Sequence, residues 1–241
     1  ILWLSNINMS LMSIMMLFLL VTGPTLYILN MILAATGDYL QNILWLSFYT
    51  DPNGIYAEKA GYNWVGGWTV FYWAWWISWG PFVGGFIARI SKGRTIKEFI
   101  TGTLIAPVLL SIVWLGIFGS TALHIDLFGA GGIAEAVAAD QTSALFITLS
   151  HLPGGNVFAI VATCLIATFF ITSADSATFC VGMYSSGGAL EPNAGVKVFW
   201  GVIEGAITAA LVVAGGIAAL KAASIFTALP FMFIICGIIY C

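Results

Sequence analysis

Residues 68–95 read WTVFYWAWWISWGPFVGGFIARISKGRT, a run that begins with aromatic side chains and ends with basic ones. Six of the ten tryptophans in the chain lie in or just before it: Trp64, Trp68, Trp73, Trp75, Trp76 and Trp79. An indole face attracts cations, above all quaternary ammonium ions. In a helix, Trp75, Trp76 and Trp79 share an arc of roughly 100°. We predict that these three face one ligand or gate, whereas Trp64 and Trp68 fit an interfacial aromatic belt.

The composition is that of a membrane protein. Hydrophobic residues make up 61% of the chain and charged residues 7%, against about 25% charge in a soluble domain. Six stretches approach the roughly 20 apolar residues that a spanning helix needs: about 9–34, 68–90, 99–123, 156–183, 198–220 and 223–241. We expect an all-α polytopic membrane protein in a lipid bilayer. The net charge of −3 is spread over loops, so no nucleic-acid partner is indicated.

Basic residues predict the orientation in the membrane. The loop after the second span carries Arg89, Lys92, Arg94 and Lys97, and Lys197 precedes the fifth span. Only Lys59 and Lys221 fall on the opposite side. The positive-inside rule therefore places the Arg89–Lys97 loop in the cytoplasm. Residues 35–67 become an extracellular segment, in which Gly37–Ser47 resembles an amphipathic helix lying on the outer face.

The fourth span ends in a polar stripe. Thr168, Thr172, Asp175 and Ser176 share an arc of roughly 100°, with Ser173 at its edge. Hydroxyl oxygens suit a small hard cation such as sodium, and a carboxylate in a span is a candidate functional residue. The alternative is that the hydroxyls bond back to carbonyls of their own helix. Glu204, midway through the fifth span, is either part of a proton relay or bonded to a neighbouring helix, and we expect the second.

Several predicted spans are interrupted by glycine and proline. The interruptions are Thr22–Thr25, Gly80–Pro81, Gly84–Gly85 and Pro107. Broken helices in transporters expose backbone carbonyls to substrates and ions near the midplane. The alternative for each is a kink or a close helix contact. We interpret Gly201-x-x-x-Gly205 in the fifth span as a small-residue packing face.

These motifs together resemble the betaine/carnitine/choline transporter family. The hallmark is the tryptophan-rich helix that runs into Ala-Arg-Ile-Ser-Lys-Gly-Arg-Thr at Ala88–Thr95. The resemblance continues through GPTLYILN at Gly23–Asn30, HLPGG at His151–Gly155 and TFFITSADSA at Thr168–Ala177. It covers nearly the whole chain. By this resemblance the chain is the C-terminal half of a transporter of about twelve spans.

The resemblance implies a leucine-transporter-like fold of two inverted five-helix repeats. Residues 1–34 would close the first repeat, and 68–241 would form the second. Trp76 would be one wall of an aromatic cage, Trp75 and Trp79 would line the cytoplasmic path, and Trp73 would lie beside them. Thr172 and Ser173 would give oxygens to one sodium site, and Phe82 would lie near a second. The family's members commonly assemble as homotrimers.

The function that we expect is import of glycine betaine, or of choline, by sodium symport and alternating access at the plasma membrane. Its purpose would be osmoprotection, with sodium as coupling ion and no cofactor. Residues Ile77–Pro81 resemble the symporter branch, although Gly80 stands where that branch often has serine. A sodium-independent exchanger of carnitine or betaine is the first alternative. A membrane-embedded enzyme is less favoured, because His124 and His151 lack paired ligand spacing. A structural subunit would leave the tryptophans without a purpose.

Overall fold

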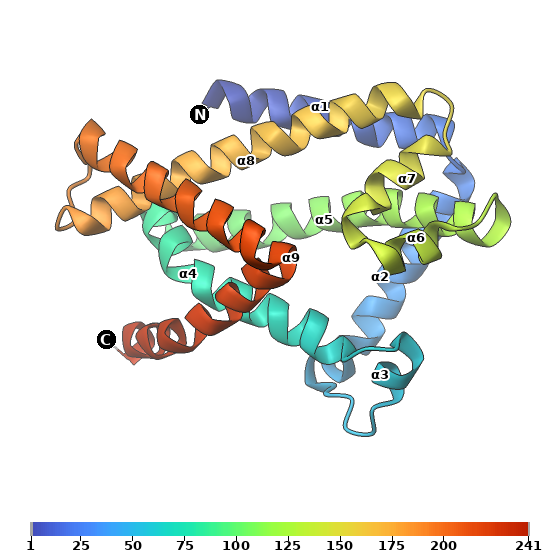
Figure 1. Ribbon diagram of the computed structural model, residues 1–241, viewed down its shortest axis with the longest axis horizontal. Coiled ribbons are helices and arrows are strands. Elements are labelled where there is room, and N and C mark those ends of the chain that lie inside the picture. The colour runs from blue at the N-terminus through green and yellow to red at the C-terminus, as the bar shows by residue number, and fades with distance from the viewer. Residues whose placement is uncertain (1, 241) are drawn as a thin grey trace. The chain divides into compact units, whose positions relative to one another are not determined.

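The computed structural model describes residues 2–240, with side chains described for residues 3–240, and the described residues contain helices and no strand. The long helices are α1 (Leu2–Thr22), α2 (Thr25–Phe48), α4 (Phe71–Ile90), α5 (Ile96–Phe128), α8 (Gly155–Ser185) and α9 (Ala194–Tyr240) (Figure 1). The short ones are α3 (Ile55–Ala60), the π-helical turn η1 (Gly66–Val70), α6 (Ile133–Ala139), the 3₁₀ turn η2 (Gln141–Ser143) and α7 (Ala144–Ser150). The predicted all-α fold is confirmed.

Four of the described helices are long and apolar enough to cross a membrane: α1 from Trp3, α5, α8 and α9. The chain is therefore a multi-pass membrane protein. Two of the six expected spans lie within α9 alone. The expected span at 68–90 is not among these four helices. It contains α4, which is rich in tryptophan, and tryptophan rings prefer the membrane interface to its centre. The last residue of the expected sixth span, Cys241, lies outside the described residues.

The chain divides into two compact units. Unit 1 comprises the residues up to 47 together with 94–172, and unit 2 comprises 48–93 together with the residues from 173 onward. The division falls inside α8, so this helix contributes its first part to unit 1 and its last part to unit 2.

The core of unit 1 lies among α1, α5 and the first part of α8. Met12, Met15 and Leu19 follow one another at helical spacing on the buried side of α1. They pack with Ile28, Ile117, Leu149, Ala162 and Leu165. The rings of Phe18 and Phe158 are stacked with centroids 3.6 Å apart, where α1 and α8 run side by side (Figure 1). Burial of these apolar side chains stabilises the unit.

The first predicted span, 9–34, differs from the structure. α1 starts earlier and stops at Thr22, and the chain breaks at Gly23–Pro24 before α2 begins. A Cβ at Gly23 would lie 2.5 Å from the Leu19 carbonyl oxygen, so only glycine fits this turn. α2 then continues to Phe48 without a break. Residues Gly37–Ser47 are helical, as predicted, but they extend α2 and do not form a short helix of their own.

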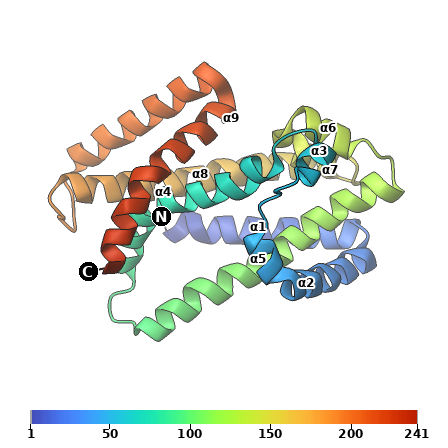
Figure 2. The same ribbon diagram turned by 90° about the horizontal axis from the view of Figure 1, so that it is seen from below.

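Unit 2 is built on α4, which packs against α9 (Figure 2). α9 turns back sharply at Gly215 (φ −170°, ψ 20°) and Gly216 (φ 59°, ψ −144°). Almost no residue other than glycine adopts the backbone angles of Gly216. The expected spans 198–220 and 223–241 put the junction after residue 220. That position is wrong, because the helix bends at Gly215–Gly216, where glycine allows the backbone angles that the bend needs.

Candidate functional site

The three tryptophans predicted to share a face do form one group of rings on α4. The ring centroids of Trp75 and Trp76 are 6.1 Å apart, and those of Trp75 and Trp79 are 6.5 Å apart. Trp76 and Trp79 meet edge to face with centroids 5.9 Å apart. The side chains are 43%, 59% and 43% exposed in chain order. The indoles therefore form a continuous aromatic surface that is partly exposed, most of all at Trp76.

Two aromatic residues that the sequence analysis passed over extend this surface by one turn. Phe71 stacks on Trp75 with centroids 6.1 Å apart, and Tyr72 lies 5.8 Å from the same ring. Trp73 points elsewhere: among the described ring contacts, none joins it to the other indoles. Trp73 is also the most exposed of them, at 66%. The contact between Phe71 and Trp75 could have been predicted from the sequence, because residues four apart meet on a helix.

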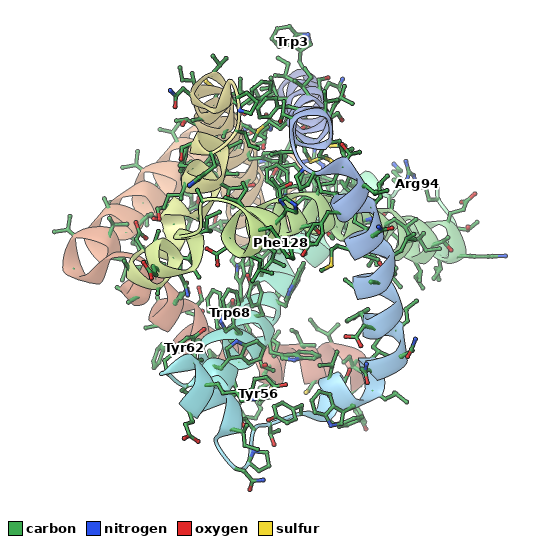
Figure 3. The ribbon with its side chains drawn as sticks, turned by 90° about the vertical axis from the view of Figure 1, so that its right-hand side faces the viewer. Trp3, Tyr56, Tyr62, Trp68, Arg94 and Phe128 are labelled. Atoms are coloured by element: carbon green, nitrogen blue, oxygen red, sulfur yellow. The ribbon has the colours of Figure 1, made fainter. Side chains whose placement is uncertain are left out.

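The aromatic surface continues before α4, at the end where the belt was expected, because Trp68 stacks on Tyr72 with ring centroids 6.0 Å apart. The indole Nε1 of Trp68 donates a hydrogen bond of 2.7 Å to the Tyr62 hydroxyl. Tyr56 lies 6.1 Å from the ring of Trp64. Figure 3 shows Tyr56, Tyr62 and Trp68 gathered in one region of the unit. Amphipathic rings that bond through their polar atoms are typical of a membrane interface.

The polar stripe of α8 is partly satisfied by its own helix. The Thr168 hydroxyl donates to the Cys164 carbonyl at 2.9 Å, and the Thr172 hydroxyl donates to the Phe169 carbonyl at the same distance. This is the back-bonding that the sequence left open as an alternative. A hydroxyl that donates its proton keeps oxygen lone pairs for a cation. Back-bonding at Thr172 is therefore compatible with a role in binding sodium.

Ser173 and Asp175 behave differently from the threonines. Both side chains are exposed, and Ser173 makes no side-chain hydrogen bond within the described part of the chain. The Ser173 hydroxyl oxygen is thus accessible without breaking an existing side-chain hydrogen bond. The ring of Phe82, which the resemblance places near a second sodium ion, packs in unit 2 against Tyr184 and Phe231, each 6.1 Å away.

The acid of the fifth span, Glu204, is half-buried and is bonded to a neighbouring helix. The Thr178 hydroxyl on α8 donates a hydrogen bond of 2.9 Å to Oε2 of Glu204 on α9. A Cβ at Gly201 would lie 3.6 Å from the Thr178 side chain, an ordinary van der Waals distance, so a small side chain would also fit between the two helices there. The hydrogen bond expected for Glu204 is confirmed. It fastens the last part of α8 to the first half of α9.

One polar residue in a core position was missed. Asn8 on α1 is 1% exposed, and neither atom of its amide group has a hydrogen-bond partner in residues 2–240. Its position seven residues before Met15 puts it on the buried stripe of that helix. The sequence could have drawn attention to Asn8, because it is a polar residue inside an apolar stripe. Burying an amide without a hydrogen-bond partner costs free energy, so such a residue is unusual there.

The basic residues form a contact network at the end of α4. The guanidinium of Arg89 lies 4.3 Å from the ring centroid of Phe179 on α8, and Lys197 on α9 lies 5.8 Å from the same ring. Arg89 also pairs with Glu191 at 3.4 Å. Lys92, Arg94 and Lys97 are exposed, and Figure 3 shows Arg94 extending away from the ribbon. Arg89 therefore contacts both a ring and an acid in unit 2, whereas Arg94 interacts electrostatically with Glu98.

These features define a polytopic helical membrane protein with an open aromatic surface and a hydroxyl-bearing helix. No cluster of three or more His, Cys, Asp or Glu side chains that suits a metal ion occurs in the described residues. The chain belongs to the family described as BCCT, betaine/carnitine/choline family transporter, which matches residues 1–241. This is a family of transporters and not of enzymes, so the alternative of a membrane-embedded enzyme is set aside.

Curated relatives agree with this family. The chain is 49% identical to the glycine betaine transporter OpuD of Bacillus subtilis over 97% of its own length and 44% of that protein. It is 43% identical to the ectoine/hydroxyectoine transporter of Virgibacillus pantothenticus, over 97% of its own length and 45% of the relative. It is 44% identical to the probable glycine betaine transporter of Desulfitobacterium hafniense, over 98% of its own length and 46% of the relative. The chain thus spans somewhat less than half the length of these relatives.

Proposed function

We propose that the protein of which this chain is a part imports glycine betaine, or a related trimethylammonium compound such as choline, by sodium symport and alternating access. The observation that carries the proposal is the joined ring surface of Trp75, Trp76 and Trp79. A trimethylammonium group holds water weakly and binds well to indole faces. Two of the relatives named above are glycine betaine transporters, one of them by probable assignment. Accumulation of such a solute would serve osmoprotection.

Sodium coupling is supported by the chemistry of α8 and the sequence of α4. Ser173 offers an unbonded hydroxyl, and Thr172 keeps lone pairs that a cation can use. Residues Ile77–Pro81 resemble the symporter branch rather than the exchanger branch. A sodium-independent exchanger remains the alternative within transport. The side chain of Phe82 has no oxygen lone pair, so near the second sodium ion it would act through the π face of its ring.

The proposed orientation places the Arg89–Lys97 loop in the cytoplasm and the protein in the plasma membrane. In unit 2, Arg89 and Lys197 meet at Phe179, whereas the Lys221 ammonium lies 5.1 Å from the ring of Phe71 at the start of α4. The basic residues assigned to opposite sides of the membrane thus lie near opposite ends of α4. A homotrimer is also proposed from the resemblance, and light scattering of the purified full-length protein tests it.

The experiment that tests the function is uptake of radiolabelled glycine betaine by cells that lack other betaine carriers and express the full-length protein. Uptake should require sodium and should stop when potassium replaces it. Excess choline and excess ectoine distinguish the substrates, because one relative is an ectoine/hydroxyectoine transporter. Betaine uptake that is equal in potassium, and that needs internal betaine or carnitine, would support the exchanger instead.

Arg89 gives a prediction for the cytoplasmic end. Arg89→Gln removes a cation–π contact and an ion pair, each contributing up to about 1 kcal/mol at a partly exposed site. We expect a maximal uptake rate lower by a few-fold, with normal membrane abundance. The matched control is Lys92→Gln, which removes the same charge from an exposed side chain. Equal rates in the two variants would leave topology as the loop's only supported role.

A further inference from the structure

The hydroxyl group of Tyr184, at the end of α8, contacts the backbone of α4. Tyr184 Oη donates a hydrogen bond of 2.7 Å to the carbonyl oxygen of Pro81. Its ring meets that of Phe82 edge to face, with centroids 6.1 Å apart. A Cβ built at Gly85 would fall 1.9 Å from Oη and 2.9 Å from the ring carbon that bears it. The phenol therefore fills the space that any side chain at position 85 would need.

The acceptor of this hydrogen bond lies at a weak point of α4. Pro81 has no amide proton and cannot bond to the Ile77 carbonyl one turn earlier. In an α-helix the Pro81 carbonyl is in turn the acceptor for the Gly85 amide. A side chain that bonds into this ladder is an established cause of helix bending. The helix is thus weakened in two consecutive turns, and Trp79 and Phe82 lie in them.

The other end of the contact is held by α9. Close to Tyr184, the Trp200 indole of α9 donates a hydrogen bond of 2.8 Å to the Ser185 hydroxyl, and Glu204 accepts one from Thr178. The second half of α9 packs against α4 instead, where Phe231 meets Phe82. Because α9 bends at Gly215–Gly216, its two halves hold α8 and α4 separately. Tyr184 then joins those two helices directly.

We propose that Tyr184 is a positioning residue that couples the sodium-binding helix α8 to the tryptophan wall on α4. Its hydroxyl holds α4 at Pro81–Gly85, where the helix is weakened, and Gly85 leaves the space through which the phenol reaches the backbone. A displacement of α8 on binding sodium is thereby passed to Trp79 and Phe82. This inference rests on the proposed sodium-coupled function, and it adds to it a residue that contacts neither ligand.

The test uses the purified full-length protein and measures betaine affinity with and without sodium. The ratio of the two dissociation constants is the coupling between the sites. Tyr184→Phe removes only the hydroxyl and should reduce this ratio by about fivefold, the equivalent of one hydrogen bond of about 1 kcal/mol. Betaine affinity in the absence of sodium should change less than twofold. A role in stability alone would lower the melting temperature and leave the ratio as in wild type.

Glycine variants provide the matched comparison. Gly85→Ala should displace the phenol and reduce the coupling at least as much as Tyr184→Phe. Combining the two changes should add little, because the hydroxyl is already displaced. Gly84→Ala is the control, since a Cβ there meets nothing within 4 Å among the described residues. If Gly85→Ala does not fold, the coupling ratio of Tyr184→Phe alone tests the role of Tyr184.

Two results separate the inference from the function on which it rests. A wild-type protein whose betaine affinity is indifferent to sodium would refute the sodium coupling itself. A wild-type protein that responds to sodium, together with a Tyr184→Phe variant of unchanged ratio, would refute only the role of Tyr184. Loss of coupling in Tyr184→Phe with an intact ratio in Gly84→Ala is the result that supports it.

Discussion

Replacing Trp76 by leucine should weaken the apparent affinity for glycine betaine by roughly thirtyfold. The change keeps an apolar side chain and removes the π face, which contributes about 2 kcal/mol to binding a desolvated cation. Trp76 is the central candidate because it is the most exposed of the three joined indoles and meets Trp79 edge to face at 5.9 Å. Trp76→Phe retains a smaller π face, so its effect should be milder.

The measurement is the betaine concentration that half-saturates uptake, with the amount of transporter in the membrane quantified for each variant. Trp3→Leu is the matched control: it removes an indole that is 80% exposed on α1, outside the joined rings. We expect that control to transport as wild type does. Unchanged half-saturation in both Trp76 variants would show that the ring surface is packing or belt and not a cage wall.

The sequence was sufficient for features that depend on residues close together in the chain. Trp75, Trp76 and Trp79 share a face because the helical repeat of 3.6 residues determines it, and the structure confirms that their rings meet. A bond from Glu204 to a neighbouring helix was expected, since a carboxylate inside a span needs a partner, and the structure shows it as the hydrogen bond from Thr178. The sequence did not say which residue that partner would be.

Features that depend on distant partners or on backbone angles were not predictable. Gly215–Gly216 resembles other glycine pairs in this chain, and only the observed backbone angles identify it as the bend of α9. Tyr184 and Gly85 are 99 residues apart, so no local pattern links them. Asn8 was overlooked because one amide hardly alters the hydropathy of α1, although its burial makes it distinctive.

Sodium dependence provides the second large effect, through Thr172→Val and Ser173→Ala. Each change removes one oxygen from two adjacent positions on α8 whose side chains point about 100° apart. We expect the sodium concentration that half-saturates uptake to rise several-fold in at least one variant. Neither change is ranked above the other, because the Thr172 hydroxyl, which donates to the Phe169 carbonyl, still keeps oxygen lone pairs for a cation.

Betaine transport should weaken along with sodium binding, because coupling between two ligands is reciprocal. Raising the sodium concentration should therefore restore much of the betaine affinity in the variants, which a misfolded site would not allow. Thr163→Val is the matched control on the same helix: its hydroxyl donates to the Ala159 carbonyl at 2.9 Å and lies outside the stripe. If Thr172→Val and Ser173→Ala both keep the sodium dependence of Thr163→Val, the stripe serves helix packing, and a sodium-independent exchanger becomes the better account of this protein.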